Sequence, residues 1–158
     1  MITIDRIKIN YQDNPVGIRE IEDISWSFWS DERNVFQKGY QLQIAGDEGF
    51  TDILYDSGNV ESSDSAHVTA EKMNGKLSSS TVYYVRVKAD TTGGETGWTK
   101  ASFVTALLSA EEWSAPFITI EKEEEKDESR GSYLRKEIRL KKQVKSAYAY
   151  TTALGLYH

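Results

Sequence analysis

Apolar and polar residues alternate along most of residues 1–105. In the clearest segment, Tyr83, Val85 and Val87 are separated by polar residues or Tyr84. A period of two places every second side chain on one face of a β-strand, so this pattern predicts half-buried antiparallel strands. Turn-forming residues separate about seven such segments, at the spacing typical of a sandwich. The predicted strands cover 2–9, 24–29, 40–44, 53–55, 67–70, 83–90 and 98–105. We therefore predict an all-β fold, an antiparallel β-sandwich of the fibronectin-III or immunoglobulin-like type, over residues 1–106.

Three local patterns add detail to this prediction. The alternation slips by one residue at Asp5-Arg6, which is typical of a β-bulge. The segment Asn14–Gly17 predicts a turn. Leu77 and Tyr83 have the spacing of a tyrosine corner, in which a Tyr hydroxyl bonds back to the preceding loop. The alternative is that both are ordinary core residues.

The pattern changes after Thr105. Ser109 and Glu112 have the spacing of a helix capping box, which predicts one short helical turn ending near Trp113. Residues 121–130 are almost wholly charged and predict a solvated loop. Two strand-like runs follow, at 134–140 and 144–152. Because two or three strands do not form an independent domain, we interpret 107–158 as a linker and the truncated beginning of a second β-sandwich domain. Unpaired strands at 133–152 would also allow the chain to dimerise through this tail.

Composition narrows the function classes. The 158 residues include no cysteine, which excludes disulfides, thiolate catalysis and sulfur-ligated metals. The formal net charge of -6 argues against nucleic acid, whose phosphates are bound by Lys and Arg. No apolar run approaches the ~20 residues of a membrane-spanning helix. The first residues do not resemble a secretory signal, so we expect a cytoplasmic protein if Met1 is the native start.

The sequence offers no convincing catalytic or metal-binding set. The pair Glu111-Glu112 is explained by the capping box, and Glu123–Glu125 lies in a charged run with no apolar neighbours. The histidines, His67 and His158, are too few and too far apart for a metal site. We therefore expect no catalytic residue, no metal ligand and no cofactor within this chain.

Three aromatic residues are the candidate contact residues. Trp29 is predicted on the face of its strand opposite Trp26, Tyr84 points outward by strand phase, and Trp98 begins the last strand. Exposed aromatic rings stack on sugars or anchor protein interfaces. Three roles remain open for Trp29, Tyr84 and Trp98: packing on a neighbouring domain, covering the sandwich, or binding a sugar.

An ordered set of short motifs extends over nearly the whole chain. None is diagnostic alone, but their order is much more specific. The set includes Asn14–Ile18, Ser25-Trp26, Gln37–Gln43, Asp56–Val60, Leu77–Tyr84, Gly97–Thr99, Phe103–Thr105, Glu112–Ala115, Leu134–Lys136, Ala147–Tyr150 and Leu154–Tyr157. Together they resemble the N-terminal region of bacterial α-L-rhamnosidases, which are large multidomain glycoside hydrolases. Lys38 and the acidic residues 121–130 depart from that family's pattern.

The resemblance implies an immunoglobulin- or fibronectin-like first domain, followed by a second β-sandwich and an all-α barrel that carries the catalytic acid and base. We therefore expect a non-catalytic accessory domain that packs on later domains of the same polypeptide, and a parent protein that is a glycoside hydrolase. Two alternatives remain. The chain could be a stand-alone protein-interaction module, or a carbohydrate-binding module for rhamnose-containing glycans.

Overall fold

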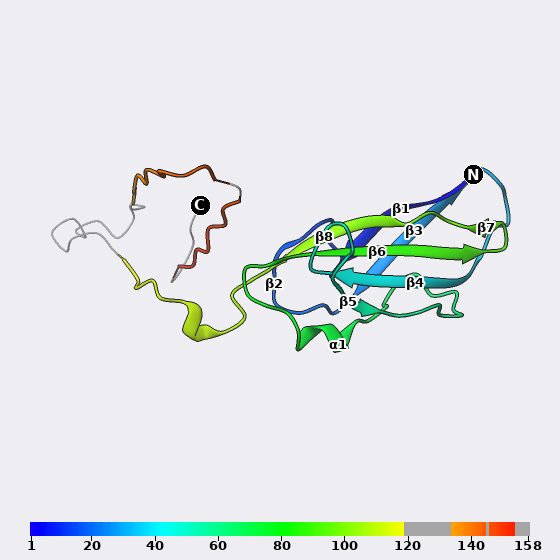
Figure 1. Ribbon diagram of the computed structural model, residues 1–158, viewed down its shortest axis with the longest axis horizontal. Coiled ribbons are helices and arrows are strands. Elements are labelled where there is room, and N and C mark those ends of the chain that lie inside the picture. The colour runs from blue at the N-terminus through cyan, green and yellow to red at the C-terminus, as the bar shows by residue number, and fades with distance from the viewer. Residues whose placement is uncertain (119–133, 145, 154–158) are drawn as a thin grey trace, which may run out of the picture. The chain divides into compact units, whose positions relative to one another are not determined.

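The computed structural model describes residues 1–118, 134–144 and 146–153. The chain divides into two compact units, Met1–Glu112 and Trp113–His158. Each unit is described by itself. Of the residues that the structure describes, the first unit contains all of the strands, and it is drawn from blue to yellow-green in Figure 1.

The first unit is a sandwich of two sheets. The smaller sheet pairs β1 (Ile2–Ile9) with β3 (Ile24–Ser30) in antiparallel fashion. The larger sheet has the order β2-β8-β6-β4-β5, with the short β7 also paired to β6. Its strands are β2 (Val16–Ile18), β4 (Gln37–Ala45), β5 (Ile53–Asp56), β6 (Val82–Thr91), β7 (Gly94–Glu95) and β8 (Thr99–Thr105). In Figure 1 the β1–β3 pair crosses β4 and β6 obliquely, as expected for two twisted sheets packed face to face.

The core between the sheets consists of the alternating apolar residues. Val85 and Val87 of β6 are fully buried, as are Leu42 and Ile44 of β4. From the smaller sheet Ile4, Ile7, Ile9, Ile24 and Trp26 complete the same cluster. The predicted fold class is therefore confirmed.

The bulge and the tyrosine corner are confirmed as well. The register between β1 and β3 shifts between Ile4 and Arg6. The buried Tyr83 hydroxyl accepts a hydrogen bond from the backbone N–H of Ser78 at 2.8 Å. This bond ties the loop before β6 to the strand that follows it.

Two local predictions need correction. The segment Asn14–Gly17 is not only a turn, because β2 begins at Val16 and pairs parallel with β8. Residues 67–70 do not form a strand. His67 has a φ of 57°, which ends the extended backbone, so that Val68 makes only an isolated bridge to Ile24. A short helix follows, α1 (Glu71–Asn74), which buries Met73 in the core.

The second unit contains no helix or strand in residues 134–144 and 146–153. The strands predicted there are not formed, and Leu134, Ile138 and Leu140 are more than half exposed. The tail dimer expected from those strands stays a prediction. The predicted charged loop at 121–130 and the terminal His158 lie outside the described residues. In the described parts of the chain, neither helical segment has the length and apolar character required to cross a bilayer.

Candidate functional site

The segment that leaves the sandwich after β8 is held to it by backbone hydrogen bonds. Ala106 donates its N–H to the carbonyl of Ile18, at the end of β2, over 2.8 Å. Its own carbonyl accepts from the N–H of Ser80 over 3.1 Å, in the loop before β6. The exit segment, residues 106–112, is therefore bonded at its start to the end of β2 and to the loop before β6.

Glu112 closes this arrangement through its carboxylate. Its Oε2 accepts hydrogen bonds from Ser79 Oγ at 2.5 Å, from the N–H of Ser109 at 3.0 Å and from the N–H of Leu108 at 3.1 Å. Ser79 Oγ also accepts from the N–H of Leu108 at 2.9 Å. The predicted helical turn is present as a 3-10 helix, Ala110–Glu112, and the bond from Ser109 to Glu112 is one half of a capping box. We call Ser79, Leu108, Ser109 and Glu112 the exit clamp.

The clamp favours the ionised form of Glu112. The hydrogen bonds from Ser79 and from the backbone of Ser109 lower the pKa of this carboxyl below its ordinary value; burial opposes them, and the N–H of Leu108 adds a further lowering contribution. Hydrogen bonds to a carboxylate stabilise the charged form, so Glu112 remains an acceptor at neutral pH. On the other side of the segment, Arg19 donates to the carbonyl of Leu108 at 3.3 Å.

The outer face of the large sheet carries a stacked arginine. The guanidinium of Arg86 lies between two rings, with its central carbon 4.3 Å from the centroid of Phe50 and 4.4 Å from that of Trp98. Its Nε donates to Gln43 Oε1 at 2.7 Å, on the neighbouring strand β4. Cation–π contacts of this kind hold both the cation and the rings in place.

A polar network continues from Arg86 to the sheet edge. Gln43 donates to Asp56 Oδ2 at 2.5 Å, and Gln41 donates to Asp56 Oδ1 at 2.9 Å. Burial raises the pKa of Asp56, but the hydrogen bonds from Gln41, Gln43 and the N–H of Gly58, together with nearby Arg86, outweigh it. The pKa therefore lies below its ordinary value. Hydrogen bonds likewise lower the pKa values of Asp31, Asp47, Glu111 and Glu112.

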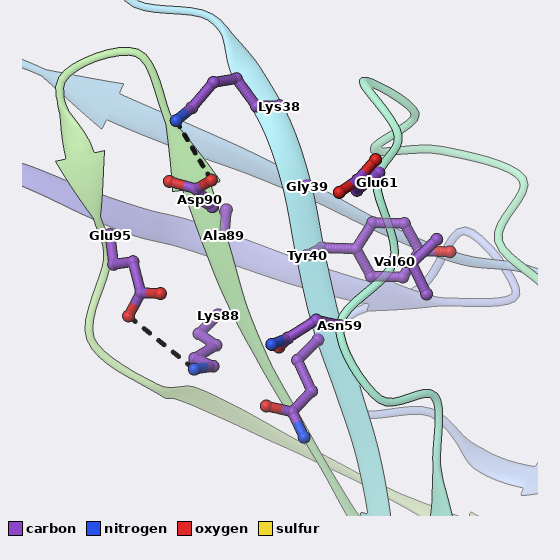
Figure 2. A pocket seen from close by; sticks show the side chains of 11 residues that line it. Lys38, Gly39, Tyr40, Asn59, Val60, Glu61, Lys88, Ala89, Asp90 and Glu95 are labelled. Carbon is purple, nitrogen blue, oxygen red and sulfur yellow. Dashed lines mark ion pairs between the residues drawn. The ribbon is translucent and has the colours of Figure 1, made fainter.

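A pocket of about 460 Å³ lies beside this network (Figure 2). Its walls come from β4, β6, β7 and residues 59–61. At one end Lys38 pairs with Asp90 at 3.2 Å, and on the β7 side Lys88 lies 3.8 Å from Glu95. Lys88 also lies 5.5 Å from the ring of Trp98, so the pocket adjoins the Arg86 stack.

The three candidate aromatic residues do not form one site. Trp98 belongs to the Arg86 stack. The half-buried Tyr84 lies on the same face of β6 as Arg86, two residues before it. Trp29 lies on the other sheet and is 54% exposed. None of the three lines the pocket. The role of Trp29, Tyr84 and Trp98 stays a prediction.

Sequence reasoning missed both the arginine stack and the pocket. Each depends on residues that are distant in sequence, since Phe50 is in a loop and residues 59–61 approach β4 only in the fold. One signal was present, namely that Arg86 and Lys88 alternate with the core residues of β6. Among the described residues, no group of three or more His, Asp or Glu side chains could hold a metal ion.

These features define a class of protein. It is an immunoglobulin-like sandwich whose described polar residues build an exit clamp, a surface network and a pocket. The comparisons with known proteins agree with this fold. The model of the Rha78A-like N-terminal immunoglobulin domain matches residues 4–109, and the chain belongs to this family.

The relatives of this chain confirm the resemblance seen in its sequence. The chain is 29% identical to an α-L-rhamnosidase of Formosa agariphila, over an alignment that covers 99% of this chain and 19% of that protein. Among solved structures, the α-L-rhamnosidase of Dictyoglumus thermophilum matches 76% of this chain with 23% identity and a TM-score of 0.65. The α-L-rhamnosidase of Streptomyces avermitilis, complexed with L-rhamnose, matches 73% with 23% identity and a TM-score of 0.61. This chain spans 14% and 12% of those two structures.

Proposed function

We propose that this chain is the non-catalytic N-terminal accessory domain of an α-L-rhamnosidase-like glycoside hydrolase. We further propose that it positions the domains that follow it in the same polypeptide. The observation that carries the proposal is the exit clamp, in which the carboxylate of Glu112 accepts three hydrogen bonds.

The clamp would work by restricting the backbone of the exit segment. Each unrestrained residue samples several backbone conformations, and fixing one costs about 1–2 kcal/mol of conformational entropy. Bonds to Ile18, Ser79 and Ser80 fix residues 106–112 against the sandwich at several points. The chain would then leave the sandwich in one fixed direction, because residues 106–112 no longer sample many backbone conformations. A domain that follows would be oriented by this restraint.

A longer protein that contains this domain and its downstream domains provides the test. Removing both side chains of the clamp, with Ser79→Ala and Glu112→Ala, should broaden the distribution of interdomain distances in small-angle X-ray scattering and lower rhamnosidase activity. Glu111→Ala is the matched control, because Glu111 lies in the same helical turn but accepts from Ser109 Oγ, whereas the clamp uses the backbone N–H of Ser109. An unchanged distance distribution in the double variant would contradict the positioning role.

The non-catalytic part of the proposal has its own test. The 158-residue chain alone should not hydrolyse an aryl α-L-rhamnoside. Turnover by this chain that survives repurification and follows its concentration would show that it is catalytic.

A rhamnose-containing glycan is a second partner that we propose. The feature that favours it is the polar pocket of Figure 2, which is separate from the exit clamp. Glycan binding by the pocket and positioning of later domains by the exit clamp use different residues. Either proposal can therefore be correct if the other is wrong.

A further inference from the structure

We propose that the pocket between β4, β6, β7 and residues 59–61 is a binding site for a single neutral sugar residue, with Asn59, Glu61 and Lys88 as its hydrogen-bonding side chains. This inference depends on the proposed glycan partner and is independent of the positioning role. It assigns the site to the outer face of β4 and β6 and not to the exposed tryptophan rings.

The pocket is held open by the fold itself. Tyr40 and Val60 exchange two backbone hydrogen bonds, at 2.9 and 2.8 Å, which fix residues 59–61 along β4. Gln37 is buried and donates to the carbonyls of Ser62 and Asp64, which anchors the segment beyond. A ligand would therefore meet a preformed wall, which reduces the entropic cost of binding.

Gly39 makes the close approach of that wall possible. A Cβ atom at this position would lie 2.8 Å from the carbonyl oxygen of Val60. Any other residue would therefore push residues 59–61 away from β4. Ala89 of the neighbouring strand also lines the pocket, with its own side chain buried in the core.

The lining offers both donors and acceptors that the protein does not use. The side chains of Asn59 and Glu61 make no hydrogen bond or ion pair with other described residues. Gln41 uses its amide nitrogen on Asp56, which leaves its carbonyl oxygen as an acceptor. The Nζ atom of Lys88 is 3.8 Å from Glu95, beyond hydrogen-bonding distance, and so retains donor capacity. Figure 2 shows Asn59 and Lys88 on the same side of β4.

Charge and polarity select the ligand class. The pocket contains two ammonium groups, Lys38 and Lys88, and three carboxylates, Glu61, Asp90 and Glu95. An anion would meet a net negative lining, and an apolar ligand would remove water from these charged groups without offering them hydrogen bonds, which is costly. Sugar hydroxyls both donate and accept, so they match this mixed lining. The volume of about 460 Å³ falls within the range of small-molecule sites, about 300–1,000 Å³.

Nuclear magnetic resonance titration of the whole chain tests the proposal. L-rhamnose and D-glucose are the neutral probes, and D-glucuronate and inorganic phosphate are the anionic ones. We expect saturable shifts of the amides of Gly39, Asn59 and Ala89 with at least one neutral sugar, and none with phosphate. The titration should reach about 0.1 M, a hundred times a Kd of 1 mM, so that weak binding is visible.

Two variants locate the site. Asn59→Ala and Glu61→Ala should each weaken binding about fivefold, the effect of one net hydrogen bond of typical strength. Both residues are exposed, so that folding should survive. The control is Glu20→Ala, an exposed glutamate outside the pocket, which should leave the affinity unchanged.

Three results would overturn the proposal. The first is the absence of saturable shifts with both neutral sugars. The second is preferential binding of glucuronate or phosphate. The third is a set of shifts centred on Trp29 or Trp98 that Asn59→Ala does not alter. None of these results would affect the exit clamp, so failure of the sugar site and failure of the positioning role are distinguishable.

Discussion

The compact unit Met1–Glu112 and residues 134–144 begin from similar sequence patterns but have different structures. In β6, Tyr83, Val85 and Val87 alternate with outward residues and are buried against the β1–β3 sheet. Leu134, Ile138 and Leu140 also alternate with charged residues, yet they are 55%, 74% and 66% exposed. The comparison shows that alternation produces a strand only when its apolar face meets a second sheet, because packing supplies most of the stability of a sheet.

The largest expected effect on the free energy of unfolding comes from removing a buried side chain in the compact unit, compared with an exposed one in residues 134–144. Phe103 is fully buried and stacks on Tyr83 at a centroid distance of 5.3 Å. Phe103→Ala should destabilise the sandwich by about 3–5 kcal/mol, through lost burial and the cavity left behind. Leu140→Ala is the counterpart outside the sandwich and should change the free energy of unfolding by less than about 0.5 kcal/mol. Chemical denaturation measures both, and similar effects of the two variants would remove the distinction between the regions.

The tyrosine corner provides a smaller effect of the same kind. Tyr83→Phe removes the acceptor of the Ser78 N–H and should cost about 1–3 kcal/mol, since a part-buried donor loses its partner. Tyr148→Phe, at a residue that is 40% exposed, should leave stability unchanged. Equal melting temperatures for the wild type and Tyr83→Phe would show that the corner contributes nothing.

Two tryptophans with equal exposure sharpen the comparison further. Trp98 and Trp113 are both 37% exposed, but only Trp98 stacks on Arg86. Trp98→Ala should lower the free energy of unfolding by about 0.5–1 kcal/mol for the lost cation–π contact at an exposed site. The apolar surface of the ring that is no longer buried should add to this loss. Trp113→Ala should have no comparable effect on urea denaturation, because among the described residues its indole N–H bonds to the carbonyl of Ala115, two positions away. A larger loss for Trp113→Ala would contradict this account of the two residues.

Acid should weaken the compact unit selectively. The pKa values of Asp47, Asp56 and Glu112 are lowered in the folded chain. A carboxyl group with a lowered folded pKa contributes stability above its unfolded pKa, and this stability is lost as the pH falls through the folded pKa. The melting temperature should therefore fall as the pH drops below the ordinary values of 4.5 for Glu and 3.8 for Asp.

A matched pair of variants tests the origin of that acid effect. Asp56→Asn should flatten the fall of the melting temperature with acid, because it removes one of the groups responsible. Glu137→Gln should leave the curve as it is, since residues 134–144 contain no packed element whose stability it could alter. A rising melting temperature below pH 4.5 would show that the sign is wrong.

Features set by neighbouring residues in the sequence could be predicted, and features set by distant ones could not. The bulge at Asp5-Arg6, the bond of Tyr83 and the turn at Ser109–Glu112 each depend on a few adjacent positions. The parallel pairing of β2 with β8 and the Arg86 stack depend on contacts between segments far apart in the chain. At 67–70, the sequence pattern predicted a strand, but the left-handed backbone of His67 leaves Val68 with only an isolated bridge. The next residues form α1, which buries Met73.

The same distinction applies to the candidate site. The capping box placed Glu112 correctly, but its bond to Ser79, 33 positions earlier, could not be read from spacing. The pocket depends on the close approach of Gly39 to Val60. These residues are 21 positions apart, and no sequence pattern predicts their contact. Trp29, Tyr84 and Trp98 were selected as exposed aromatics, but the structure separates Trp29 from the other two by placing it on a different sheet.

Amide hydrogen exchange of the intact chain tests the exit clamp most directly. If the clamp fixes the exit segment, the amides of Ala106 and Leu108 should exchange at least about tenfold more slowly than those of residues 134–144, since hydrogen-bonded amides exchange only after local opening. Ser79→Ala with Glu112→Ala should abolish that protection at Leu108 and leave that of Val85 intact. Exchange of Leu108 in the wild type as fast as in residues 134–144 would contradict the claim that this domain directs the chain that follows it.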